Sequence, residues 1–201
     1  NHYYMLADKE EYKIAVIKNK PIRRVARNGY KLKLLKTMDE LKKHFNIQAY
    51  KGMKPFKDDW CIEHRYYNNM AYTYLVYGID KGEKVFDSIL VCREVIHNET
   101  KICKIVDFIG IDEDIGNLSK EFNNMILNNE YEYIDFYCLG IPDNMLKKAG
   151  FTLRTQDDTN IIPQLFEPFV RKNKDIEYFT NEIEDFYMFR GDADQDRANI
   201  L

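Results

Sequence analysis

Cysteine is scarce in this chain, and none of its four residues, Cys61, Cys92, Cys103 and Cys138, forms a C-x-x-C pair. This spacing excludes the usual zinc-ribbon and thioredoxin-like motifs. Most of the cysteines fall inside expected strands, so structural thiols in a reducing compartment are favoured over a disulfide framework. An apolar run of transmembrane length is also missing. These absences predict a cytoplasmic protein without a membrane span.

The chain also lacks a large excess of positive or negative charge. The chain has 30 Lys and Arg residues against 33 Asp and Glu residues, and its formal net charge is -3. No basic field is available to recruit nucleic acid, so nucleic acid is not an expected partner. Tryptophan occurs once, but 15 Tyr and 12 Phe residues predict a sheet whose faces are partly exposed to solvent, or a groove lined with aromatic rings.

The middle of the chain carries the clearest fold signal. Lys101–Ile111 and Tyr131–Leu139 are rich in β-branched and aromatic residues and predict buried strands. Between them, Asn117–Asn128 has apolar residues at helical spacing. This order, with a helix of about twelve residues, predicts parallel strands and a right-handed crossover. Asp143–Ala149 is expected to form a short helix after the second strand.

The residues before this unit predict antiparallel strands. Tyr72–Ile79 and Lys84–Ile96 are separated by a glycine-containing turn, and another short turn leads into the central strand. The predicted fold class is therefore α/β, with a mixed sheet in which an antiparallel meander precedes a parallel strand–helix–strand unit. Further strands are expected at 12–18, 30–35 and 186–189, and a further helix at 38–45.

Three sequence stretches resemble a known family. LKKAGF (146–151) is similar to the Y-x-K-x-G-F ending after the fourth helix of the GNAT superfamily of N-acetyltransferases. IEHRYYNNMAYTYLVYGI (62–79) and GDADQDRAN (191–199) resemble GNAT-like proteins of bacterial capsule and O-antigen biosynthesis. Several of those proteins carry two GNAT-like halves. We therefore expect residues 1–201 to be a single GNAT-like domain that forms the C-terminal half of a longer protein.

The resemblance implies a site for acetyl-CoA or another acyl-CoA. In GNAT proteins the central strand parts from the next parallel strand, and the pantetheine pairs with the exposed backbone. The pyrophosphate binds amides at the start of the following helix. The implied acceptor is an amino group of a sugar or sugar nucleotide used for surface polysaccharide. The cofactor residues that the resemblance assigns are Phe108, Ile109, Gly110, Ile111, Gly116 and Asn117.

The phosphate loop departs from the family pattern Q/R-x-x-G-x-G/A. It reads DEDIGN (112–117), which keeps Gly116 and places three carboxylates near the pyrophosphate. Leu146 stands where the family often has a tyrosine that protonates the leaving thiolate, and leucine cannot donate a proton. A catalytically inactive GNAT-like binding or interaction module is therefore the alternative to an N-acyltransferase. Transfer from aminoacyl-tRNA, as in Fem-type ligases, would need a basic surface.

Three residues are candidates for the chemistry of amine acylation. Glu94 and His97 precede the central strand, where GNAT proteins often place a general base. A histidine titrates near neutral pH without perturbation, although a surface histidine in a turn is the plainer interpretation of His97. Asp107 is a lone carboxylate in an apolar run. It is either a site residue or one half of a buried hydrogen bond.

Candidates for substrate binding occur in two places in the body of the chain. His64, Arg65 and Tyr67 offer hydrogen-bond donors and ring faces for a sugar, although an exposed aromatic turn would have the same composition. Tyr137 and Cys138 alternate faces on their strand, so one of the two can face a cleft. Core packing is the expected role of Cys138, which leaves Tyr137 as the substrate candidate.

The tail contains D-x-D-x-D at 192–196, which resembles the start of a calcium loop. Arg197 follows where the sharp turn of such a loop needs glycine, so no metal site is expected. The family likeness instead implies a polar turn on the substrate side of the sheet, with Asp194 and Arg197 as binding residues. Arg197 would pair with a carboxylate or phosphate.

Overall fold

The computed structural model describes residues 1–201 apart from 23–24, 28, 156, 165–169, 182–183 and 194–201. The strands are β1 (His2–Leu6), β2 (Lys31–Leu34), β3 (Leu75–Asp80), β4 (Ile89–His97), β5 (Thr100–Ile109), β6 (Tyr131–Leu139), β7 (Thr152–Leu153) and β8 (Met188–Phe189). They form one sheet in the order β2-β3-β4-β5-β6-β1-β7, and β8 pairs with β6 outside this path. β5 and β6 are parallel, whereas the other pairs are antiparallel. The α/β class and the mixed sheet are therefore confirmed.

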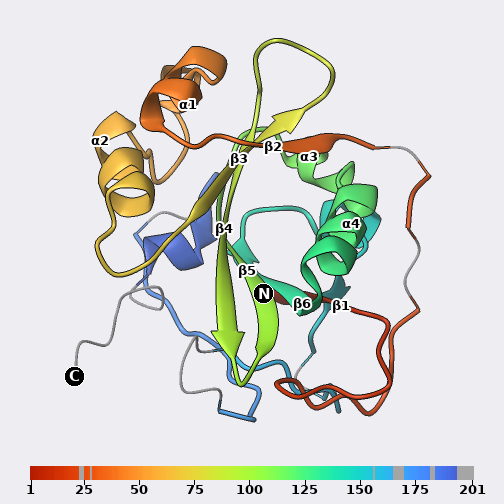
Figure 1. The fold of residues 1–201 in the computed structure, drawn as a ribbon. Helices are drawn as coiled ribbons and strands as arrows, with labels where there is room; N and C mark the ends of the chain where they lie inside the picture. Colours follow the sequence, from red (N-terminus) through yellow and green to blue (C-terminus); the bar gives the residue numbers. More distant parts are fainter. Residues whose placement is uncertain (23–24, 28, 156, 165–169, 182–183, 194–201) are drawn as a thin grey trace.

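Helices cover both faces of this sheet (Figure 1). The helices are α1 (Met38–His44), the 3-10 helix η1 (Ile47–Tyr50), α2 (Asp59–Ile62), the π-helix η2 (Glu63–Tyr67), α3 (Asp112–Gly116), α4 (Ser119–Asn129), α5 (Asp143–Lys148) and the 3-10 helix η3 (Arg190–Asp192). Leu41 of α1 and Ile62 of α2 belong to the core on one face. Phe122 of α4 and Leu146 of α5 belong to the core on the other face. Strands covered on both sides explain the continuous apolar runs in the sequence.

The two ends of the described chain meet on β6. β1 pairs with β6 from His2↔Tyr137 to Leu6↔Tyr133, and all of its residues are buried. β8, from the far end of the chain, pairs with the last residues of the same strand. β6 therefore has β1 on one side, and β5 and β8 on the other.

The strand expected at 12–18 is wrong. The amides of Lys13, Ile14 and Ala15 donate to the carboxylate of Glu132 at 2.7, 2.9 and 2.8 Å. Three successive amides that converge on one carboxylate bend the backbone away from an extended strand. The apolar residues Ile14 and Ala15 are buried, but the sequence pattern could not show that a side chain would take the hydrogen bonds of a strand partner.

Other predicted elements differ at their ends. The helix from Met38 is present, and the Thr37 hydroxyl accepts a hydrogen bond from the Glu40 amide at 3.1 Å, as an N-cap does. The strand expected at 84–96 begins later, at Ile89. The acidic segment expected to be a loop is the helix α3.

Candidate functional site

β5 and β6 part toward their carboxyl ends. Their parallel pairing runs from Lys101↔Tyr131 to Ile105↔Phe136. Beyond these residues β5 continues to Ile109 and β6 to Leu139 without a further pair between the described residues of the two strands. Ligands of α/β proteins commonly bind beyond the carboxyl ends of the strands. The space between the two strands, the β5/β6 gap, is therefore the first candidate site.

The chain itself fills the β5/β6 gap. β8 pairs antiparallel with the end of β6, and η3 follows directly. A Cβ atom added at Gly191 would lie 3.3 Å from the carbonyl oxygen of Val106 on β5 and 2.3 Å from the Tyr66 hydroxyl oxygen. Because a larger residue would collide here, glycine is what allows η3 to lie against β5.

η3 reaches a buried ionic cluster on the β6 side of the gap, formed by His2, Lys104, Asp135 and Arg190 (the Asp135 cluster). Arg190 Nη2 donates to Asp135 Oδ2 at 2.7 Å, and His2 Nε2 lies 2.8 Å from the same oxygen. Lys104 Nζ donates to Asp135 Oδ1 at 3.1 Å. All four side chains are fully buried. Arg190 also donates to the carbonyl of Gln164 at 2.9 Å.

Burial changes the proton affinity of the Asp135 cluster. At His2, burial outweighs the attraction of Asp135 and lowers the pKa to about 4. Burial also outweighs Asp135 at Lys104 and lowers the pKa of that ammonium to about 7. At Asp135 burial raises the pKa, but Lys104, Arg190 and His2 together hold it well below its usual range. His2 Nδ1 is buried without a hydrogen-bond partner in the described part of the chain. Asp135 is thus ionised and His2 neutral at pH 7.

A second buried cluster lies on the β5 side of the gap and consists of Lys57, Tyr66, Asp107 and Asp192 (the Asp107 cluster). Lys57 Nζ lies 2.5 Å from Asp107 Oδ1 and 3.0 Å from Asp192 Oδ1. The Tyr66 hydroxyl donates to Asp107 Oδ2 at 2.5 Å. Burial lowers the pKa of Lys57, but Asp107 and Asp192 outweigh it and raise the pKa above its usual value. This cluster therefore keeps its single ammonium charged.

η3 joins the two clusters across the gap. Arg190 binds Asp135 on β6, whereas Asp192 binds Lys57, which in turn holds Asp107 on β5. Removing one partner from a buried ion pair costs about 3–5 kcal/mol, because the other charge stays buried. Withdrawing η3 from the gap would break one ion pair in each cluster, while Asp135 would keep Lys104 and Lys57 would keep Asp107.

Backbone amides at the end of β5 are also engaged. The Phe108 amide donates to the carboxylate of Asp107 at 2.8 Å. The Ile111 amide donates to the Ser88 hydroxyl at 2.9 Å. Both amides belong to the segment that the resemblance assigns to pantetheine, and neither is free for a ligand in this conformation.

The acidic residues of α3 point partly into the protein. Asp114 is buried, accepts a hydrogen bond from the Ser88 hydroxyl at 2.6 Å and pairs with Lys81 at 2.9 Å. Asp112 is half-buried and accepts a hydrogen bond from the Tyr187 hydroxyl at 3.2 Å. Burial, as the largest effect, raises the pKa of Asp112. These contacts tie α3 to Ser88, Lys81 and Tyr187.

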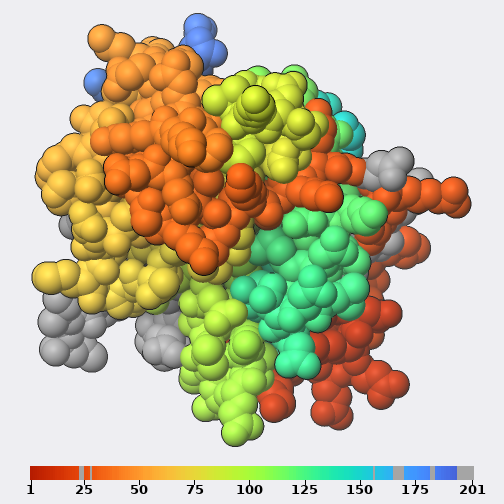
Figure 2. Space-filling view, turned by 45° about the horizontal axis from the view of Figure 1, so that its top comes forward, coloured from red at the N-terminus to blue at the C-terminus, as the bar shows by residue number. Residues whose placement is uncertain are grey.

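The start of α4 is covered as well. The Ala26 amide donates to the Ser119 hydroxyl at 3.2 Å, and the Tyr30 amide donates to the carbonyl of Asn117 at 3.0 Å. Figure 2 shows the orange-red residues around β2 against the green α4. Gly116 is buried at the end of α3. The Asn117 amide, which the resemblance assigns to the cofactor, donates to the carbonyl of Asp114 at 3.1 Å, so it is engaged by the chain itself.

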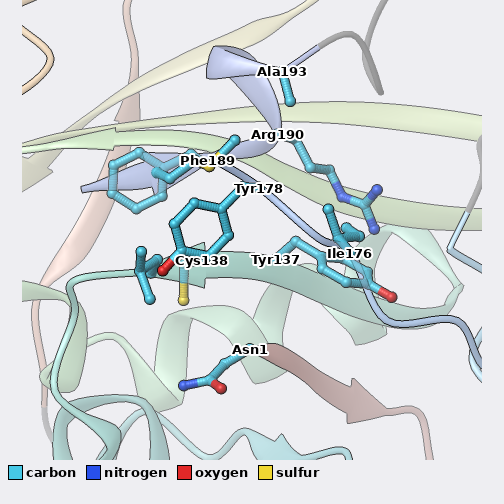
Figure 3. A pocket seen from close by; sticks show the side chains of 10 residues that line it. Asn1, Tyr137, Cys138, Ile176, Tyr178, Phe189, Arg190 and Ala193 are labelled. Carbon is cyan, nitrogen blue, oxygen red and sulfur yellow. The ribbon is translucent and has the colours of Figure 1, made fainter. Parts of the chain in front are cut away.

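A small pocket of about 70 Å³ opens beside β8. Figure 3 shows Tyr137 and Cys138 on β6, between Asn1 on one side and Phe189 and Arg190 on the other. The Tyr137 ring stacks on His2 at 3.9 Å, and the Arg190 guanidinium lies 4.4 Å from the same ring. Sites for drug-sized ligands measure about 300–1,000 Å³, so this pocket cannot take an acyl-CoA. The described residues do not fit that cofactor in this conformation.

The structure places the candidates for general base apart from the gap. Val91 is the β4 residue opposite Asp107, which borders the gap. His97 lies six residues further along β4, a distance of about 20 Å at about 3.3 Å per residue. Glu94 lies between them. Of the three proposed chemical residues, Asp107 alone lies at the gap, where Lys57 and a tyrosine hydroxyl engage its carboxylate.

The first group of substrate candidates lies on η2. His64 stacks on Trp60 with 4.4 Å between ring centroids, and its Nδ1 lies 2.9 Å from the carbonyl oxygen of Trp60. The Tyr67 hydroxyl donates to the carbonyl of Leu35 at 3.2 Å. Arg65 belongs to the same turn. His64 and Tyr67 therefore contact different segments, and none of the three candidates lines the pocket at Tyr137.

Asp194 and Arg197 lie outside the described residues, so their predicted role stays a prediction. The neighbouring Asp192 belongs to the Asp107 cluster. Among the residues that the structure describes, no group of three or more His, Cys, Asp or Glu side chains could hold a metal ion. No helix within the described ranges is both long and apolar enough to cross a membrane.

Sequence reasoning missed most members of the two clusters. Lys104 and Asp135 could have been recognised from the sequence, because each is a charged residue inside a strand that is predicted to be buried. Asp107 was recognised in this way. Lys57 and Arg190 left none. They lie in irregular segments, where no periodicity distinguishes a buried charge from an exposed one.

Comparison with known proteins gives no matching family model, no match among curated proteins and no match among solved structures. The fold and the site are therefore described by their geometry alone. The protein is of the α/β class with a mixed sheet, in which the parallel strands β5 and β6 part toward their carboxyl ends and β8 and η3 of the same chain occupy the space between them.

Proposed function

We propose that this chain is a binding module with GNAT-like architecture whose cofactor cleft is closed by its own β8 and η3, and that it does not transfer acyl groups from CoA. The antiparallel run β3–β4–β5, the parallel β5–α4–β6 unit and the parting of β5 from β6 support this architecture. They are the features that the resemblance implies around a pantetheine site.

The single observation that carries this proposal is η3 in the β5/β6 gap, tied by Arg190 to Asp135 and by Asp192 to Lys57. A ligand entering the gap would expel η3 and break the pairs of Arg190 with Asp135 and of Asp192 with Lys57, at about 1–3 kcal/mol each, because each remaining buried group keeps a second partner. Micromolar affinity corresponds to about 8 kcal/mol. The two broken pairs would therefore offset a large part of the binding energy of a CoA ligand.

An N-acyltransferase acting on the amino group of a sugar or sugar nucleotide is the second candidate. The parting of β5 and β6, with α4 beginning at its far end, favours it. This activity would require η3 to leave the gap. Asp107, rather than Glu94 or His97, would then be the carboxylate nearest to the opened cleft.

Calorimetric titration of the chain with acetyl-CoA and with free CoA at low salt tests the proposal. We expect no binding at about millimolar ligand, which corresponds to less than about 4 kcal/mol. The matched variant Asp192→Asn removes the charge that ties η3 to Lys57. Micromolar binding by the wild type would contradict a closed module and favour the acyltransferase. CoA binding that appears only in Asp192→Asn would agree with closure of the cleft by η3.

A further inference from the structure

A second concave site lies at the start of β3, away from the β5/β6 gap. β3 begins at Leu75, opposite Cys92, so residues 93–97 of β4 extend past it. The segment 71–74 passes beside this extension, and α4 ends nearby at Asn129. Together they enclose a groove of about 570 Å³, within the range of about 300–1,000 Å³ typical of small-ligand sites. In Figure 2 the surface is hollowed where the yellow segment, the lime hairpin and the green α4 meet.

Three tyrosines line this tyrosine groove: Tyr72 before β3, Tyr77 on β3 and Tyr131 at the start of β6. The guanidinium of Arg93 stacks on the Tyr72 ring, 3.2 Å from its centroid, which holds the ring in place. Tyr72 and Tyr77 are half-buried, so part of each ring meets solvent. Such rings present flat apolar surfaces that end in a hydroxyl group.

Polar groups lie among the rings. Glu94 lies near the Tyr131 side chain, and its carboxylate provides a hydrogen-bond acceptor in the groove. Asn129 is exposed at the end of α4 and adds an amide donor and acceptor. Fixed hydrogen-bonding groups between ring faces give a ligand both orientation and apolar contact.

The charge of the groove narrows the class of ligand. Arg93 and Glu94 are adjacent and of opposite sign, so the lining carries no net charge. A phosphate or another strong anion would meet the Glu94 carboxylate, and the cation that could bind it lies against a ring. A purely apolar ligand would shield the Glu94 carboxylate and the Asn129 amide from water, which is costly. The lining is matched by an uncharged polyol whose C–H faces lie on rings and whose hydroxyls bind carboxylate and amide groups.

We propose that the tyrosine groove binds carbohydrate, one monosaccharide unit at a time, with the sugar ring against Tyr72 or Tyr77 and its hydroxyls on Glu94 and Asn129. The site is separate from the β5/β6 gap. This inference goes beyond the proposed function and stands whether or not the chain transfers acyl groups.

The test uses the full chain labelled with nitrogen-15 and titrated with glucose, galactose and N-acetylglucosamine. Each sugar is added to about 50 mM, because single sugar units bind weakly, at about 4 kcal/mol or less. Amide resonances of residues 72–77, 93–94 and 129–131 are expected to shift with at least one sugar. The variants Glu94→Gln and Tyr72→Leu are expected to weaken that binding at least about tenfold, or 1.4 kcal/mol. Ile96→Ser, on the same strand but outside the groove, is the matched control and should bind like the wild type.

The outcomes are distinct from those of the CoA titration. Sugar-dependent shifts confined to the tyrosine groove and lost in Glu94→Gln support the inference, even if CoA is found to bind in the gap. An absence of shifts with all three sugars overturns it. Resonance shifts centred on other residues overturn the inference as well. So does an unchanged sugar affinity in both Glu94→Gln and Tyr72→Leu, if their spectra show a folded protein.

Discussion

The Asp135 and Asp107 clusters border the same gap but have opposite charge balance. The Asp135 cluster surrounds one carboxylate with Lys104, Arg190 and His2, and burial removes charge from the weaker bases. The Asp107 cluster surrounds one ammonium with two carboxylates and a phenol, and Lys57 stays charged. In each cluster the residue of the minority sign, Asp135 or Lys57, stays charged, because the surrounding groups of opposite sign outweigh the cost of burial.

The largest expected difference between the clusters comes from the same substitution in each. Asp135→Asn leaves Lys104 and Arg190 without a counter-ion, so we expect a loss of about 3–5 kcal/mol in the free energy of unfolding. Asp107→Asn leaves Lys57 paired with Asp192, so a smaller loss of about 1–3 kcal/mol is expected. Urea denaturation at pH 7 measures both. Equal losses would show that charge balance does not distinguish the clusters.

The next effect concerns pH and is specific to the Asp135 cluster. His2 has a pKa of about 4 in the folded protein against 6.5 when unfolded. The unfolded chain therefore binds more protons between these values, and stability falls as pH drops from 6.5 toward 4, by up to about 3 kcal/mol. His2→Gln cannot titrate and should flatten this part of the profile. Urea denaturation at several pH values from 4 to 7 checks it; a slope unchanged in His2→Gln would mean that another group is responsible.

A steric test sharpens the comparison on the β5 side. Gly191→Ala places a Cβ atom 2.3 Å from the Tyr66 hydroxyl oxygen, so we expect about 1–3 kcal/mol of destabilisation. Tyr66→Phe removes that oxygen and its hydrogen bond to Asp107, at about 1–2 kcal/mol. The double variant should lose less than the sum, by at least about 0.5 kcal/mol. Strictly additive losses in thermal or urea unfolding would place η3 further from Tyr66 than described.

The smallest effect is expected outside both clusters, on α3. Glu113→Gln changes an exposed carboxylate that belongs to neither cluster, and its stability should stay within about 0.5 kcal/mol of the wild type. Asp114→Asn, one residue away, weakens the pairing of a buried carboxylate with Lys81 and should cost about 1–3 kcal/mol. Similar losses in the two variants, measured by urea denaturation, would contradict the inward placement of Asp114.

Local pattern was sufficient for the regular elements. Tyr131–Leu139 matches β6 residue for residue, and the helix beginning at Met38 was recognisable from its cap. Periodicity reports burial, and burial on both faces marks a strand in a covered sheet. The same reasoning failed at 12–18, because burial there comes with backbone hydrogen bonds to Glu132 rather than to a neighbouring strand.

The sequence by itself determined the α/β class, the parallel unit around the central strand and the abundance of tyrosine that lines the groove. Only the tertiary structure decided that β1 and β8 meet on β6, and that η3 closes the β5/β6 gap through Arg190 and Asp192. The physical reason is sequence separation: Arg190 and Asp135 are 55 residues apart, and Lys57 and Asp192 are 135 residues apart. No local periodicity links such residues, because their burial and pairing arise only when the whole sheet has formed.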